Sequence, residues 1–194
     1  MKLKLPGVLG AILLLAGCGQ QHAEYHGGGG TLEAINHTKW AIQFSVNGQS
    51  GIDIIGPFQG GGGGCCFGAP STWEPGMTVR VDWETSVAFA SDVPEIPKPK
   101  RPSMNNLDAK TADSVARKYN IEYLAWREKV KKLSRQHSLT VPVPDYTGQK
   151  TCGMVVHFLP CDQVKVTTSC SRYGYPDYPI KEPLEMEAPK VCPK

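Results

Sequence analysis

The stretch from Gly60 to Glu84 constrains the fold of this 194-residue chain more than any other. It begins with five consecutive glycines, which reach positive φ and admit a close backbone at an entropic cost on folding, and continues into the adjacent Cys65 and Cys66. A Pro-Gly turn follows, and apolar residues then alternate with polar ones up to Trp83, which is typical of a half-buried strand. We predict a covalently fixed loop that is presented by a β-sheet.

The N-terminus predicts export. Lys2 and Lys4 precede a short apolar run that ends in Leu-Ala-Gly-Cys18, and this run is far shorter than the roughly 20 residues of a membrane-spanning helix. The sequence before Cys18 resembles the cleavage box of bacterial lipoproteins, in which the cysteine is diacylated and becomes the first residue. The alternative is an ordinary signal peptide with an incidental cysteine. We expect residues 1–17 to be the signal peptide and 18–30 a lipidated, flexible tether. The resemblance to lipoproteins also implies sorting by the residue after the cysteine, and Gly19 in place of Asp favours the outer membrane, facing the periplasm.

Charge and cysteine content narrow the class of protein to which this chain can belong. Without the leader, the chain has 19 basic and 18 acidic side chains, which argues against nucleic-acid binding. An even number of cysteines remains after Cys18, and in an oxidising compartment they predict up to three disulfides, in which we expect each to pair with a cysteine that is not its neighbour. The candidates are Cys65, Cys66, Cys152, Cys161, Cys170 and Cys192. Zinc is the competing interpretation, but no C-x2-C spacing occurs among them.

Residues 31–194 read as one globular domain, mainly β within the α+β class. We expect a small antiparallel β-sandwich or meander, stapled by disulfides, whose front half, through Ser86, is a compact meander. Alternating residues predict strands near 32–34 and 40–46, followed by an Asn47-Gly48 hairpin turn and a short strand at 52–55. Further strands are expected near 140–144, where prolines require an edge position, and at 154–159 and 164–168.

A long helical insertion is predicted at about 104–137. The prolines between Pro94 and Pro102 indicate an extended spacer before it, with no packing role of its own. Apolar residues then recur at spacings of three and four, the pattern of an amphipathic helix. They are Ala116, Tyr119, Tyr123, Trp126, Val130, Leu133 and His137. Eight basic and four acidic residues between Leu107 and His137 indicate either a solvated face or a surface for anionic lipid or an acidic partner.

We expect no catalytic site, cofactor or metal. A nucleophile needs a base within hydrogen-bond distance, and only Cys152 or Cys161 with His157 offers a local thiol and imidazole. Oxidised cysteines and a mid-strand histidine favour a structural role over a thiol hydrolase. The glycine run lacks the Lys-Ser/Thr of a phosphate-binding loop and does not lead into a predicted helix, so we do not expect nucleotide binding.

Several short motifs are similar to a domain-of-unknown-function family of proteobacterial lipoproteins. The resemblance rests on Asn36-His37-Thr38, Phe44 to Gly48, the glycine run ending in Cys65-Cys66, Pro70 to Met77 with Trp73, Val79-x-Val81-x-Trp83, Val156 to Pro160 and Tyr178-Pro179-Ile180. Members are often encoded beside phospholipase effectors of type VI secretion and act as their immunity proteins.

The resemblance implies a lipid-anchored periplasmic immunity protein that binds and neutralises a cognate phospholipase. The alternative is an envelope lipoprotein that recruits another cell-envelope protein. We expect the partner to contact the glycine loop first, with the helical insertion as the second choice. The candidate contact residues are Gly62, Gly63, Gly64, Phe67 and Trp73, although both aromatic side chains also suit a core.

Overall fold

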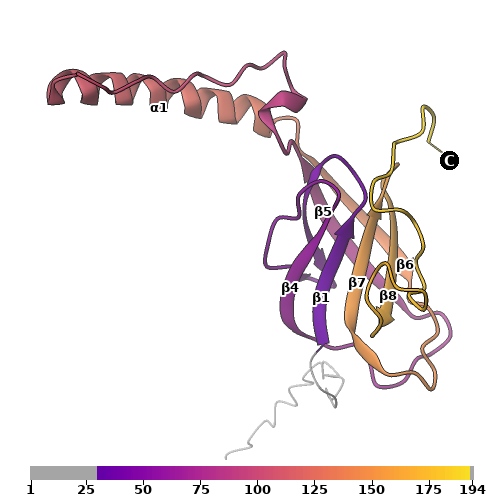
Figure 1. Ribbon diagram of the computed structural model, residues 1–194. Helices are drawn as coiled ribbons and strands as arrows, with labels where there is room; N and C mark the ends of the chain where they lie inside the picture. The colour runs from indigo at the N-terminus through magenta and orange to yellow at the C-terminus, as the bar shows by residue number, and fades with distance from the viewer. Residues whose placement is uncertain (1–29, 193–194) are drawn as a thin grey trace, which may run out of the picture.

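The computed structural model describes residues 30–192, except the side chain of Cys65; the predicted signal peptide, Cys18 and nearly all of the tether lie outside them. Two four-stranded sheets face each other, with strand orders β4-β1-β7-β8 and β3-β2-β5-β6 (Figure 1). The elements are β1 (Gly30–Asn36), β2 (Ala41–Val46), β3 (Gln49–Ser50), β4 (Gln59–Phe67), β5 (Thr78–Ser86), η1 (Ala90–Asp92), α1 (Ala109–Lys131), β6 (Arg135–Pro142), β7 (Thr151–Leu159) and β8 (Gln163–Ser169). This arrangement confirms the expected mainly-β α+β class with one helix.

Alternating side chains from both sheets fill the space between them. Leu32 and Ala34 of β1 and Val156 of β7 are fully buried, as is Val81 of β5 in the other sheet. Phe158 packs edge-on against Phe44, with ring centroids 5.5 Å apart, so the two sheets are in direct aromatic contact. The period-two alternation of the sequence therefore marks the core face of each strand correctly.

The predicted meander of the front half is wrong. β1 pairs in parallel with β7, with Ala34 opposite Val156, and in antiparallel fashion with β4. β2 and β5 belong to the opposite sheet, so the chain crosses between sheets after β1, before β4 and again before β5. Alternation specifies which face of a strand is buried, but it does not specify which strand lies beside it.

The glycine run is an edge strand and not the predicted loop. It forms most of β4, and its register with β1 shifts twice along the pair. Gly62 has φ of +111°, and a Cβ atom there would lie 3.2 Å from the carbonyl oxygen of Leu32. Glycine is therefore needed both for the dihedral angle and for the close approach to β1.

The predicted hairpin turn is present in the structure, but the short strand predicted after it is not. Asn47 and Gly48 both have positive φ and connect β2 to β3, as the Asn-Gly pair predicts. The strand expected at 52–55 is absent from the described fold, where only Ile55 forms an isolated bridge, with Ile42.

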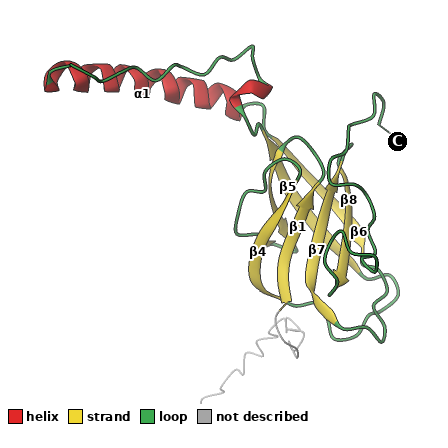
Figure 2. Cartoon of the chain, in the orientation of Figure 1, coloured by secondary structure: helices red, strands yellow, loops and turns green. Residues whose placement is uncertain are grey.

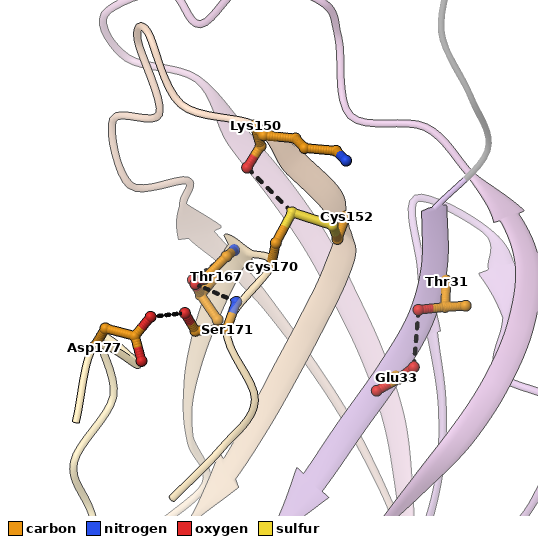
Figure 3. Close-up of a disulfide and its surroundings, with 9 residues drawn as sticks. Thr31, Glu33, Lys150, Cys152, Thr167, Cys170, Ser171 and Asp177 are labelled. Atoms are coloured by element: carbon orange, nitrogen blue, oxygen red, sulfur yellow. Dashed lines mark hydrogen bonds between the residues drawn. A yellow bond between two sulfur atoms is a disulfide. The ribbon is translucent and has the colours of Figure 1, made fainter. Parts of the chain in front are cut away.

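Two disulfides fix the back half. Cys152 is bonded to Cys170, which joins the start of β7 to the end of β8, and the nearby Ser171 hydroxyl donates a hydrogen bond to Asp177 (Figure 3). Cys161 is bonded to Cys192 and holds the C-terminal segment, which confirms both cysteines as disulfide candidates. These four cysteines pair with one another, so neither Cys65 nor Cys66 has its partner among them.

The predicted helix exists but is shorter than expected. α1 begins after Asp108, whose carboxylate accepts hydrogen bonds from the backbone N–H groups of Lys110 and Thr111, and not near residue 104. It ends at Lys131, because the chain from Arg135 onward joins β5 as edge strand β6. Leu133 and His137 therefore lie off the helix. No helix of the described residues is both long and apolar enough to cross a membrane.

Candidate functional site

A projecting arm, residues 93–134, is the most prominent feature outside the sandwich. It leaves the end where β5 finishes and β6 begins, with α1 pointing away from both sheets (Figures 1 and 2). The 23 residues of α1 make it about 34 Å long, and none of them is buried. The helix therefore adds surface to the molecule and contributes no buried residue to its core.

The proline-rich segment packs along α1, contrary to the expectation that it has no packing role (Figure 1). The indole N–H of Trp126 donates to the carbonyl oxygen of Ile96 at 2.8 Å. The ammonium of Lys98 lies 5.7 Å and 5.6 Å from the ring centroids of Tyr123 and Trp126, within cation–π range. An extended proline segment leaves its carbonyl groups free, so it can accept such bonds while it covers the aromatic stripe.

The opposite face of α1 is uncovered. Ile121 and Leu124 are 69% and 56% exposed, although each is a large apolar side chain. Arg117 and Glu128 lie on the same face, since the four residues follow one another at spacings of four, three and four. Arg117 also forms an ion pair with Asp113 one turn earlier. This face, which we call the outer face, carries apolar residues among charges of both signs.

Charge is divided unevenly between the arm and the sandwich. The arm has ten basic and five acidic side chains, whereas the remaining described residues have eight basic and twelve acidic ones. The near-neutral total therefore conceals a basic arm on an acidic body. Such a separation gives the arm and the sandwich electrostatic potentials of opposite sign.

A cavity of about 420 Å³ opens at the same end of the sandwich. Ile42, Phe58 and Trp83 line its apolar part, together with Trp40, which is partly exposed beneath the Lys39 ammonium. The imidazole of His137 stacks on Trp83, with centroids 4.9 Å apart. The arm and this cavity therefore lie at one end of the molecule.

The residues expected to contact a partner are placed differently. Phe67 is only 6% exposed and belongs to the core. Trp73 packs against that core, and its indole N–H donates to the carbonyl oxygen of Val143 at 3.0 Å. Gly62 and Gly64 are buried within β4, while Gly63 is exposed. The exposed large apolar side chains of α1 instead belong to the helical insertion, which the sequence analysis gave as the second choice of contact surface.

A buried hydrogen-bonded chain holds the C-terminal segment below this end. His37 Nδ1 lies 2.7 Å from the carbonyl oxygen of Pro183, and His37 Nε2 lies 2.8 Å from His157 Nδ1. His157 Nε2 in turn lies 2.7 Å from the Tyr178 hydroxyl oxygen. All three side chains are essentially inaccessible to solvent. The sequence motifs contain each residue, but nothing in them indicates that histidines 120 positions apart meet.

Only one set of neutral tautomers satisfies the chain of bonds. The Pro183 carbonyl can only accept, so His37 carries its proton on Nδ1 and accepts at Nε2. His157 must then donate from Nδ1 and accept at Nε2 from the Tyr178 hydroxyl. Burial, and next the neighbouring His37, lowers the pKa of His157 to about 3, and burial also lowers the pKa of His37. Both rings are neutral near pH 7.

The thiol–imidazole pair considered from the sequence is not formed. Cys152 and Cys161 are both in disulfides, and both ring nitrogens of His157 are occupied. Across the described residues, no group of three or more His, Cys, Asp or Glu side chains is placed to hold a metal ion. His157 therefore serves to attach the C-terminal segment to the sheet.

Comparison with known proteins gives one match. A family model described as a protein of unknown function (DUF3304) matches residues 35–166. No curated protein and no solved structure matches this chain. The matched range runs from β1 into β8 and includes the whole arm. The chain therefore belongs to the DUF3304 family of proteins of unknown function.

Proposed function

We propose that this protein is a lipid-anchored periplasmic immunity protein that binds a phospholipase delivered by type VI secretion and blocks it without catalysing a reaction. One observation carries the proposal: an ordered arm projects from a disulfide-tied sandwich and exposes apolar side chains on its outer face.

The energetics of the arm favour a role in binding. Ordering one residue costs roughly 1–2 kcal/mol of backbone entropy, and most of the stability of a helix in a protein comes from packing, of which α1 has little. α1 offsets part of this cost with its Asp108 cap and the contacts between Trp126 and the proline segment. A rigid, pre-ordered element lowers the entropy cost of association, which is an advantage in an inhibitor.

The remaining support comes from the sequence. A leader that ends at Cys18 and disulfides in the back half both suit an oxidising compartment. A lipid anchor would hold the inhibitor at the bilayer where a phospholipase acts and raise its effective concentration there. Immunity to phospholipase effectors follows from the family resemblance described above.

Co-expression tests the proposal. The mature chain, with Cys18 replaced by serine to keep it soluble, is co-expressed and purified with the phospholipase effector that the family resemblance leads us to expect beside its gene. We expect a stable complex and loss of phospholipid hydrolysis at equimolar protein. Full hydrolysis at saturating protein, with no complex by gel filtration, would reject the proposal and favour recruitment of another envelope protein.

A further inference from the structure

We propose that the outer face of α1, formed by Arg117, Ile121, Leu124 and Glu128, is the docking surface and that it inserts into an apolar groove edged by carboxylates on a partner protein. Under the proposed function, on which this inference rests, the groove belongs to the phospholipase. The inference adds the surface and the chemistry of the partner.

The spacing of the face matches a helix that binds in a groove. The four residues span eleven positions of α1, about 16 Å along the axis, and project from one side. Ile121 and Leu124 stand at its centre and are more than half exposed. Large apolar side chains at the centre of a patch, with charges around them, are the usual composition of an interface core and rim.

The inner face of α1 cannot serve this purpose. Tyr123 and Trp126 point toward the proline segment, where Lys98 lies over both rings and Ile96 accepts the indole hydrogen bond. A partner could reach these rings only by displacing that segment. The outer face is therefore available without rearrangement, and the proline segment acts as a splint behind it.

Charge indicates the rim of the groove. Lys118 and Lys132 flank the outer face, and the whole arm has an excess of five basic side chains. Acidic residues around the groove would complement this excess and accelerate encounter. Glu128 on the same face gives the contact a fixed direction, because it would need a basic counterpart at one end of the groove.

A protein fits this face better than a lipid surface does. Membrane-surface helices combine a broad apolar face with a basic polar face, whereas here two large apolar residues share their face with Glu128, next to Asp113. In addition, the arm leaves the sandwich at the end opposite Gly30, the first residue of β1 (Figure 1), so an anchor that precedes Gly30 is attached to the other end of the sandwich.

The test compares two matched pairs of substitutions in the mature, Cys18→Ser chain. Ile121→Gln with Leu124→Gln removes the apolar centre but keeps good helix formers. The control, Ile52→Gln with Ile54→Gln, changes two isoleucines of similar exposure on the sandwich. Affinity for the phospholipase is measured by calorimetry, and inhibition by the rate of phospholipid hydrolysis. Circular dichroism verifies that both variants are folded, as expected because all four side chains are exposed.

We expect the helix variant to lose at least 100-fold in affinity and inhibition, and the control to stay within threefold of the parent. If the parent inhibits and the helix variant inhibits equally well, this inference is wrong while the proposed function stands. If the parent neither binds nor inhibits the phospholipase, both this inference and the proposed function are wrong. Two further results would overturn the inference. One is that the parent chain, but not the helix variant, sediments with phosphatidylglycerol vesicles. The other is that the parent chain, but not the helix variant, self-associates.

Discussion

Tyr178→Phe tests the buried hydrogen-bonded chain by removing one oxygen atom. The phenylalanine ring fills the same space, but His157 Nε2 loses its donor in a site that water cannot reach. Switching tautomers does not help, because a proton on His157 Nε2 would leave His37 without a donor, and His37 cannot switch without facing the Pro183 carbonyl. An unsatisfied buried acceptor costs about 1–3 kcal/mol. For a domain of this size, about 2 kcal/mol corresponds to a fall in Tm of roughly 4–8 °C.

Thermal unfolding of the oxidised protein at pH 7 provides the assay. Tyr175→Phe is the matched control, since its ring is 60% exposed and belongs to the same C-terminal segment. We expect the control to unfold within about 1–2 °C of the parent. A Tyr178→Phe protein as stable as the control would show that the hydroxyl donates nothing to His157, and the assignment of both tautomers would be wrong.

Four further predictions concern stability. Burial lowers the pKa of His157 to about 3, so below about pH 6.5 this histidine is protonated in the unfolded chain and not in the folded one. The free energy of unfolding should therefore fall by about 1.4 kcal/mol per pH unit between about pH 6.5 and the folded-state pKa. Urea midpoints that coincide at pH 7 and pH 5 would contradict this. Replacing Cys152 and Cys170 with serine opens a loop of 18 residues and should lower the free energy of unfolding, measured in urea, by about 3 kcal/mol. Trp126→Phe loses the hydrogen bond to the proline segment, so hydrogen exchange in the arm should accelerate while the Tm of the sandwich stays unchanged. An unaltered exchange rate would show that this bond does not stabilise the arm. Gly153→Ala should lower the free energy of unfolding in urea by at least about 3 kcal/mol, because φ is +107° and the new Cβ would lie 2.1 Å from a backbone oxygen of β1. A variant as stable as the parent would contradict the close approach of β7 to β1.

Local patterns predicted the parts of the fold that depend on neighbours in sequence. Val79, Val81 and Trp83 alternate along β5 and are all buried. The even number of cysteines after Cys18 correctly indicated disulfides, although it did not indicate which cysteines pair. The helix was also recognised, because the spacing of its aromatic residues requires a helical period.

Features that depend on distant partners were missed. The glycine run looked like a loop because glycine has no side chain to alternate, although its close contact with β1 is what calls for glycine. His157 resembled an isolated residue in the middle of a strand, and His37 belonged to a separate motif. Only the parallel pairing of β1 with β7 brings the two together. The aromatic stripe of α1 predicted a packed face but not that Ile96 and Lys98 of the same arm would cover it.

Titration of the phospholipase that the proposed function assigns as the partner, with the mature chain as titrant, tests the central claim most directly. The initial rate of phospholipid hydrolysis should fall linearly with added protein and reach zero near one equivalent, as expected when a tight inhibitor removes one enzyme molecule at a time. A rate that stays unchanged through a large molar excess would contradict the account and leave the arm without its assigned partner.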